Sequence, residues 1–414
     1  MKRTVAIVGG GPAGLAAATE LRRMGVERVV VFERERDPGG IPRHCAHQGF
    51  GIRDLRSLLS GPSYARRRAQ LAAAAGAEIR TRTTVTGWGT DGELELTSPT
   101  GRAEFTADAI LLATGCRERP RSARLIPGTR PAGVMTTGTL QQLVHLRGVA
   151  VGSRAVVVGA EHVSFSALAT LSHAGVRTVC MTTEQAHHQS FELFRMGARL
   201  RYGLRLRTQS RLTAIHGGTR VEAVELTDLA TGDAELVGCD TVVLTADWIP
   251  DHELAALGGI DLDRATRGPA VDGALRTSRT GVFAAGNLLR GAETADVAAL
   301  EGRHAARRIV RHLAGGGWPQ RRLAINVQAP LAWITPNIAA DDPTIPPRGV
   351  HLVRAATFVP DRELLVTQGD RNIWRGPVSR LQPGRSGTLP AASLAGIDPS
   401  GTAVEIRVSS PSGP

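Results

Sequence analysis

The sequence predicts an α/β fold with two Rossmann-like domains, the second inserted in the first, and a small C-terminal antiparallel β domain. One observation is a β-rich apolar run over residues 4–8 that gives way, through a glycine turn, to an alanine-rich helical pattern. A second is the return of strand, turn and helix in the same order over residues 155–173. A third is the change after Gly315-Gly316-Gly317 to short alternating runs between Pro- and Gly-rich turns.

The turn between the first strand and the first helix carries Gly9, Gly11 and Gly14 in a G-x-G-x-x-G pattern. These glycines suit a dinucleotide, because they allow a tight turn, a close approach to a pyrophosphate and close packing of helix on strand. The helix N-terminus adds free N–H groups and a partial positive charge. The second strand, residues 29–32, ends at Glu33, where a carboxylate would meet a ribose 2′-hydroxyl. This order favours a dinucleotide site over a glycine-rich turn without a ligand.

The remaining segments of the first domain follow in order. Asp37 to Ile41 predicts a loop, and Gly61-Pro62 opens a helix, since proline is tolerated in a first turn. Further strands are predicted over residues 79–85, 94–96 and 109–112, and the last of these runs into Ala113-Thr114-Gly115. The Arg- and Pro-rich residues 117–133 then mark a crossing to the second domain.

The second domain repeats the first at the same spacing. The interval from Gly9 to Glu33 equals that from Gly159 to Thr183, which indicates two copies of one dinucleotide-binding unit. We predict the following boundaries: the first domain at residues 1–118 and 270–316, the second at 119–269, and the C-terminal β domain at 321–408. Trp318, Trp333 and Trp374 are expected to anchor the core of the C-terminal domain.

The second glycine turn is less suited to a nucleotide than the first. Glu161 stands at the position of the second glycine, Ser164 at that of the third, and Thr183 at that of Glu33. A carboxylate about 4 Å from a phosphate costs roughly 4 kcal/mol at an effective dielectric near 20. We therefore expect NAD(P) to bind there poorly or not at all. The alternative is that Glu161 turns outward, or that a less charged ligand uses the cleft.

The 414-residue chain is strongly basic, with a net charge of +12, so nucleic-acid binding has to be considered. Its cations are scattered arginines, Lys2 being the only lysine, and no zinc-finger or RNA-recognition signature accompanies them. A compositional bias explains the charge better than a nucleic-acid partner does. The scarcity of lysine also removes most candidates for a Schiff base.

The four cysteines, Cys45, Cys116, Cys180 and Cys239, form no C-x-x-C pair and no zinc spacing with histidines. We expect no metal site and a reduced, cytoplasmic protein. No run approaches the 18 or so apolar residues that a membrane span needs, so no membrane span is predicted.

Residues 281–287, Gly-Val-Phe-Ala-Ala-Gly-Asn, form another strand-to-turn segment, and a helical pattern follows over residues 293–313. Together with Gly9-x-Gly11-x-x-Gly14 and Ala113-Thr114-Gly115, this segment resembles the two-dinucleotide flavoproteins of the pyridine nucleotide oxidoreductase superfamily over residues 1–315. The resemblance implies an oxidoreductase with FAD on the first domain. It also implies these cofactor contacts: Gly9, Gly11, Pro12, Ala13, Gly14, Glu33, Arg34, Gly40, Ile41, Val85, Ala113, Thr114, Gly115, Gly286, Asn287, Thr294 and Ala295.

Within that set the resemblance gives some positions particular roles. Glu33 would bind the adenosine ribose, and Gly286 and Asn287 would lie near the ribityl chain and the pyrophosphate. Thr294 and Ala295, at a helix start, would lie by the pyrimidine edge of the flavin, where negative charge collects on reduction. Asn287 stands where the superfamily usually has aspartate, so an acceptor oxygen is kept and a charge is removed.

Three further motifs resemble a narrower group: Gly39-Gly40-Ile41, Cys45-x-His47-x-Gly49-Phe50-Gly51, and Gly61-Pro62-x-Tyr64-Ala65. The group comprises the flavoprotein that accompanies glycerol-3-phosphate-type dehydrogenases and the α subunits of heteromeric amino-acid and amine dehydrogenases, such as sarcosine oxidase, opine oxidase and hydrogen cyanide synthase. The resemblance implies an electron-handling subunit whose second flavoprotein partner oxidises an amino acid, amine or hydroxy compound. A small iron–sulfur subunit is a further possible partner, since this chain has no cluster-binding cysteine set. The alternatives are a stand-alone NAD(P)H-dependent flavin reductase and a non-catalytic electron-relay or assembly subunit.

Cys45 and His47 are the only candidates for catalytic side chains, because a cysteine near histidine can be activated as a thiolate. A packing pair in a loop is the favoured interpretation, and a disulfide reductase would need a second cysteine nearby. The C-terminal β domain carries no nucleotide motif, so we expect it to be an addition that does not hold the flavin.

Overall fold

The computed structural model describes residues 3–409, which form two compact units. The first unit comprises the chain up to Arg43, Gln48–Arg117, and the chain from Ile249 onward. The second comprises His44–His47 and Glu118–Trp248. The chain enters the second unit through β10 (Cys116–Glu118) and returns through β19 (Trp248–Pro250). Within the described residues, no helix combines the length and the apolar character that a membrane crossing requires.

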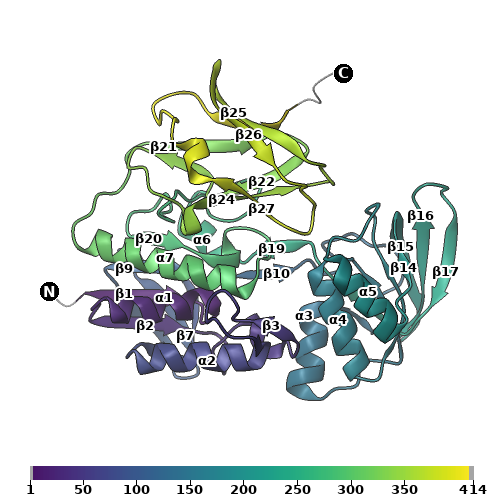
Figure 1. Ribbon diagram of the computed structural model, residues 1–414. Coiled ribbons are helices and arrows are strands. Elements are labelled where there is room, and N and C mark those ends of the chain that lie inside the picture. The colour runs from purple at the N-terminus through teal and green to yellow at the C-terminus, as the bar shows by residue number, and fades with distance from the viewer. Residues whose placement is uncertain (1–2, 410–414) are drawn as a thin grey trace. The chain divides into compact units, whose positions relative to one another are not determined.

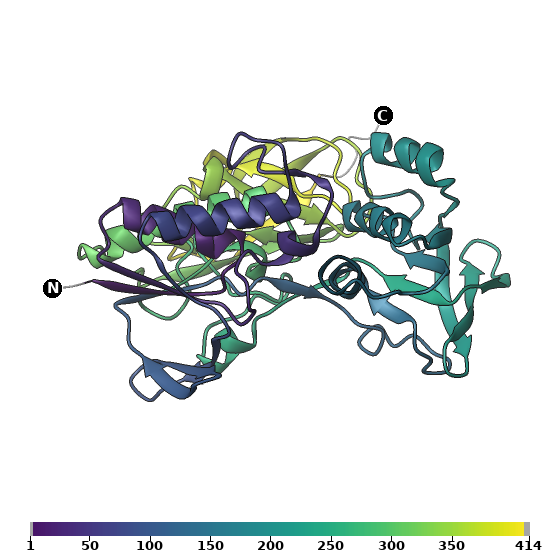
Figure 2. The ribbon, with the colours of Figure 1, turned by 90° about the horizontal axis from the view of Figure 1, so that it is seen from below.

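The first unit is built on a five-stranded parallel sheet in the order β20-β9-β1-β2-β5 (Figure 1). Its strands are β1 (Thr4–Val8), β2 (Arg28–Phe32), β5 (Glu78–Arg80), β9 (Ala109–Leu112) and β20 (Val282–Ala284). The helices α1 (Pro12–Arg23), α2 (Gly61–Ala74) and α7 (Ala295–Leu313) lie together on one side of this sheet (Figure 2). The strands read as continuous Val, Ile and Leu runs because both faces of the sheet are covered.

Smaller elements complete this part of the first unit. An antiparallel sheet consists of β6 (Thr84–Trp88), β7 (Leu94–Ser98) and β8 (Gly101–Phe105). The short elements are η1 (Ile41–His44), β3 (Gln48–Phe50), β4 (Leu59–Ser60), α6 (Glu253–Leu257) and η3 (Gly286–Leu288). The single strand predicted over residues 79–85 is divided between β5 and β6, because the chain turns at Arg82, whose φ is +51°.

The second unit contains a parallel sheet in the order β11-β18-β12-β13-β14. Its strands are β11 (Val134–Thr136), β12 (Arg154–Val158), β13 (Arg177–Thr182), β14 (Leu206–Arg207) and β18 (Thr241–Leu244). The order β18-β12-β13-β14 repeats β9-β1-β2-β5, which confirms two Rossmann-like folds in one chain. The other elements are α3 (Thr137–Gln141), the π-helical turn η2 (Gln142–Leu146), α4 (His162–His173), α5 (Glu192–Tyr202), and the antiparallel strands β15 (Ser210–Gly217), β16 (Val221–Asp228) and β17 (Ala234–Gly238).

The C-terminal β domain, residues 321–408, belongs to the first unit and contains two sheets. One has the order β23-β21-β28-β25-β26 and the other β22-β24-β27. The strands are β21 (Arg322–Val327), β22 (Leu331–Thr335), β23 (Ile338–Ala340), β24 (Val350–Ala355), β25 (Arg362–Gln368), β26 (Arg371–Val378), β27 (Gly387–Pro390) and β28 (Val404–Val408), with short turns at η4 (Pro347–Gly349) and η5 (Ala391–Leu394).

The prediction of a purely antiparallel C-terminal domain needs one correction, because β21 runs parallel to β28. The two strands come from the opposite ends of the domain, so no hairpin forces them to be antiparallel. Of the three tryptophans expected in its core, Trp374 packs there. Trp318 instead packs edge-on against Phe283 in the first core, and Trp333 packs against Val297 at the start of α7.

Candidate functional site

The first glycine turn is shaped by close backbone contacts. Gly9 has a φ of +109°, and a Cβ there would lie 2.3 Å from the carbonyl oxygen of Ala113. A Cβ at Gly14 would lie 2.0 Å from the carbonyl oxygen of Gly9. The chain itself therefore requires glycine at the first and third positions of the motif.

Gly11, the second glycine of the motif, is not required by packing. A Cβ built there comes no closer than 4.0 Å to the nearest described atom outside its neighbours, the Cα of Gly40. Gly11 is the N-cap of α1 and has no side chain to accept from the helix amides. The first turn of α1 also has no acidic residue. Open space at the positive end of a helix fits the pyrophosphate of FAD.

Glu33 lies at the end of β2, directly beside the glycine turn, and is only 6% exposed. Its Oε2 accepts a hydrogen bond from the amide of Gly10 at 3.0 Å, and its Oε1 accepts one from the amide of Glu35 at 2.8 Å. These two bonds fix the carboxylate, while each oxygen keeps a lone pair for a ribose hydroxyl. The position therefore fits the predicted ribose contact.

The loop after β2 returns to the same turn. The amide of Gly39 donates to the carbonyl of Gly10 at 2.7 Å, and a Cβ at Gly40 would lie 3.0 Å from the Cα of Gly11. Three other predicted contacts lie on neighbouring segments. Ile41 is exposed at the start of η1, and the exposed Arg34 has its Nη2 3.7 Å from Asp251 Oδ2. Val85, on β6, packs against the main core.

Ala113, Thr114 and Gly115 follow β9 and are held by the chain that returns after β19. The Thr114 hydroxyl donates to the carbonyl of Asp251 at 2.8 Å, and the Asp251 amide donates to the carbonyl of Gly115 at 2.9 Å. The predicted Ala-Thr-Gly turn is thus fixed beside Gly9, whose missing side chain makes room for Ala113.

The turn at Gly286 and Asn287 packs against the start of α1, and α7 packs along α1. A Cβ at Gly286 would lie 2.9 Å from the Cβ of Ala13, so this turn packs on the first residues of α1. The Asn287 side chain accepts from the amide of Glu293 at 3.0 Å and donates to its carbonyl at 3.2 Å. An aspartate could not donate this second bond, which gives asparagine a structural reason here. Thr294 caps α7 by accepting from the amide of Val297 at 3.4 Å.

The sequence analysis missed a buried ion pair beneath this turn. Arg290 is fully buried and pairs with Glu301 of α7, whose Oε2 also accepts from the amide of Gly286 at 3.1 Å. Burial raises the pKa of Glu301, and the charge of Arg290 opposes that rise. The available signal was an acidic residue in the middle of the buried face of α7, between Ala298 and Ala305.

The second glycine turn differs from the first as the sequence suggested. The amide of Glu161 donates to the Ser164 hydroxyl at 3.1 Å, and that hydroxyl also bonds Thr245 Oγ1 at 2.6 Å. Thr183, which stands in place of Glu33, accepts from Gln189 Nε2 at 3.0 Å. The neighbouring Glu184 is exposed and pairs with Arg211 at 2.8 Å. The Glu161 amide and the hydroxyls of Ser164 and Thr183 thus all bond to the protein itself.

Cys45 is buried in the second unit and donates a hydrogen bond from Sγ to Gln141 Oε1 at 3.3 Å. Burial, helped by the charge of Glu118, raises the pKa of Cys45 to about 12. His47, its proposed companion, is exposed. Cys45 is therefore a thiol at neutral pH, which argues against a thiolate nucleophile. Within the described residues no two of the four cysteines form a disulfide.

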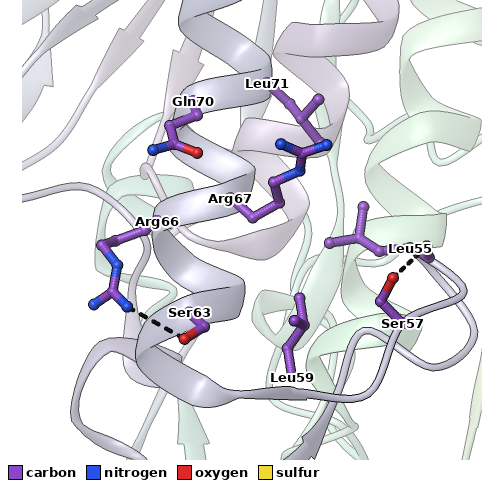
Figure 3. A pocket seen from close by; sticks show the side chains of 8 residues that line it. All are labelled: Leu55, Ser57, Leu59, Ser63, Arg66, Arg67, Gln70 and Leu71. Atoms are coloured by element: carbon purple, nitrogen blue, oxygen red, sulfur yellow. Dashed lines mark hydrogen bonds between the residues drawn. The ribbon is translucent and has the colours of Figure 1, made fainter.

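A surface pocket of about 430 Å³ lies between α2 and the segment 55–59 (Figure 3). In it the Arg66 guanidinium donates to Ser63 Oγ at 3.2 Å, and the Ser57 hydroxyl donates to the carbonyl of Leu55 at 3.3 Å. The pocket is lined by Leu55, Ser57, Leu59, Ser63, Arg66, Arg67, Gln70 and Leu71. None of these residues is a predicted cofactor contact. We therefore do not assign the nucleotide site to it.

Comparison with known proteins agrees with the geometry of the first turn. Residues 3–302 match the family model of the pyridine nucleotide-disulphide oxidoreductases. One of the subunits of opine oxidase from Rhizobium meliloti is 29% identical over 331 residues, which cover 71% of this chain and 60% of that protein. The HcnB subunit of hydrogen cyanide synthase from Pseudomonas aeruginosa is 30% identical over 261 residues, which cover 60% of this chain and 53% of that protein.

The chain thus spans about 60% or less of the length of these two relatives. Among solved structures, thioredoxin reductase of Lactococcus lactis matches with a TM-score of 0.64 at 20% identity, and the match covers 76% of this chain and 100% of that one. This similarity shows a shared fold.

Proposed function

Because this chain belongs to the pyridine nucleotide-disulphide oxidoreductase family and is an FAD-dependent oxidoreductase, we propose that it is the electron-handling subunit of a heteromeric dehydrogenase. The substrate class is an amino acid, an amine or a hydroxy compound, oxidised on a second flavoprotein subunit. Two of the relatives carry the names of oxidase or synthase subunits, which supports a subunit role.

The residues of the first glycine turn would hold the FAD. Gly11 leaves room for the pyrophosphate at the N-terminus of α1, and Glu33 offers its carboxylate to the ribose. The N-terminus of α7, capped by Thr294, would lie by the pyrimidine edge and offer it a partial positive charge. Bound FAD would supply two-electron redox chemistry, and these residues bind and orient it.

The observation that carries the proposal is the contrast between the two glycine turns. Glu161 puts a carboxylate at the second position of the motif, and Thr183 supplies no carboxylate for a ribose, which supports a poor fit for NAD(P)H. A poor NAD(P)H site favours a second protein as the electron donor or acceptor. The second Rossmann-like sheet favours one rival, a stand-alone NAD(P)H-dependent flavin reductase.

Calorimetric titration separates the two functions. NAD(H) and NADP(H) are titrated into the FAD-loaded protein and into Glu161→Gly. We expect no micromolar binding to the unmodified protein and a gain of affinity in the variant. Micromolar binding to the unmodified protein would contradict this expectation and favour the stand-alone reductase. Co-purification from the native host, followed by cofactor release and a substrate screen, then tests for the second flavoprotein and for a small iron–sulfur subunit.

A further inference from the structure

The loop of residues 287–294 begins within η3 and leads into α7, where Thr294 and Ala295 are the predicted pyrimidine-edge contacts. Hydrogen bonds within the loop join its two ends, because the Asn287 side chain bonds to the backbone amide and carbonyl of Glu293. The C-terminal β domain, expected to have no part in the site, also contacts this loop directly. The relevant residues all belong to the first unit.

Arg354 of β24 makes most of that contact through one nitrogen. Its Nη2 donates to the carbonyl of Ala292 at 3.2 Å and to Glu293 Oε1 at 2.9 Å. The hydroxyl of Ser386 lies 3.0 Å from the same nitrogen, whose two hydrogens are shared among the three acceptors, and this hydroxyl donates to Glu293 Oε1. The Arg354 and Glu293 side chains are only 11% and 13% exposed, so water screens their pairing little.

Apolar packing fixes the same corner. The Arg354 guanidinium lies over the ring of Trp333, 4.8 Å from its centroid. Trp333 and Leu352 of the C-terminal domain form a buried cluster with Val297, in the first turn of α7. The guanidinium is therefore held in one orientation, and the N-terminus of α7 is seated on the C-terminal domain.

We infer that Arg354 is a positioning residue for the flavin, acting through Glu293 and the carbonyl of Ala292 on the loop of residues 287–294. It fixes the backbone that leads into Thr294 and Ala295, and it balances the charge of Glu293 beside the predicted pyrimidine edge. This inference rests on the proposed placement of FAD on the first glycine turn.

If Arg354 balances the charge of Glu293, removing either side chain shifts the flavin midpoint potential in opposite directions. A purely structural role would not produce opposite shifts. Arg354→Met leaves the Glu293 carboxylate unbalanced, and a negative charge near the flavin lowers its midpoint potential because reduction adds electrons. Glu293→Gln leaves the arginine unbalanced and raises the midpoint potential. The double variant returns the potential toward that of the unmodified protein. A loop that is merely loosened would shift both single variants in the same direction.

The experiment uses the full chain. FAD affinity is measured by fluorescence titration, the midpoint potential by dye equilibration, and loop motion in the flavin-free protein by hydrogen exchange. We expect Arg354→Met to weaken FAD binding by about tenfold or more, as the loss of a buried charged hydrogen bond does. Exchange in the peptide covering residues 287–294 should also speed up.

Arg322→Met is the matched control. Arg322 also links the C-terminal domain to the first domain, through the carbonyls of Ala270 at 3.0 Å and Arg276 at 3.3 Å, but it does not touch the loop. It should leave the midpoint potential and the exchange of the loop unchanged. Equal effects of Arg322→Met and Arg354→Met, or potential shifts of one sign in both single variants of the Arg354–Glu293 pair, would overturn the inference. An unmodified protein that binds no FAD would instead refute the proposed function.

Discussion

At the scale of single residues, Gly11 is the position whose geometry is explained by a ligand and not by the chain. The atoms around it leave a side chain free room, whereas Gly9 and Gly14 are closed by backbone atoms. Gly11→Asp is therefore expected to fold and to lose FAD. A carboxylate about 4 Å from the pyrophosphate costs roughly 4 kcal/mol, or about three decades of affinity.

The measurement for Gly11→Asp is flavin occupancy after purification, beside the FAD dissociation constant. Gly197→Asp is the control, since Gly197 lies in α5 with no atom near a built Cβ and with an ordinary helical φ. The control should keep full occupancy. A yellow, fully loaded Gly11→Asp protein would remove FAD from the first glycine turn.

Cys45 yields a prediction about pH. An exposed cysteine thiol has a pKa near 9.0, and burial raises the pKa of Cys45 to about 12 in the folded state. The native fold therefore favours the neutral thiol, and this stabilisation is complete below about pH 9 and is lost as the pH rises toward 12. We expect the free energy of urea unfolding to fall more steeply above about pH 9 in the unmodified protein than in Cys45→Ser. Parallel pH profiles would show that Cys45 titrates normally.

At the scale of elements, Asp54 ties two helices to the loop that precedes α2. Its carboxylate accepts from the Tyr64 hydroxyl at 2.8 Å and from Arg68 Nε at 2.7 Å, both on α2. Arg303 of α7 lies 2.7 Å from the other oxygen. Asp54 and Arg68 are buried, so removing the shared charge leaves a buried guanidinium without its counter-ion.

Asp54→Asn is accordingly expected to destabilise the protein by about 3–5 kcal/mol, measured by urea unfolding. The matched change Glu78→Gln removes an exposed partner of Arg28 and should cost at most about 1 kcal/mol. Equal losses in the two variants would mean that burial does not set the strength of the Asp54 network.

At the scale of the whole molecule, sequence reasoning reached the features that short-range spacing determines. The Gly9–Gly14 motif, Glu33 and the repeated strand order of the second domain follow from intervals of a few tens of residues and from the period of the strands. The Arg354–Glu293 pair joins residues 61 positions apart, and the Arg290–Glu301 pair joins the loop before α7 to the buried face of that helix. Ion pairs of this kind depend on how distant segments pack together. Hydrophobic periodicity along the sequence does not predict that packing.

Contacts between the C-terminal domain and the first domain lead us to revise the expectation that the C-terminal domain has no part in holding the flavin. Besides Arg354, the Asn337 side chain accepts from the amide of Val271 at 2.9 Å, and Asp342 lies 2.8 Å from Arg276 Nη1. Ending the chain after Gly317 removes these partners and exposes Val297, which packs on Trp333. The buried Arg276 keeps its pair with Asp272 but loses Asp342, so the loss reaches the segment that leads into β20.

We therefore expect the truncated chain to melt at a lower temperature and to bind FAD at least tenfold more weakly, because the α7 N-terminus is no longer seated. Thermal denaturation and flavin titration measure the two effects. Arg375→Met, which breaks only an exposed pair with Glu363 between β25 and β26, should change neither by much. A truncated chain with an unchanged FAD dissociation constant would restore the view that the C-terminal domain is independent of the site.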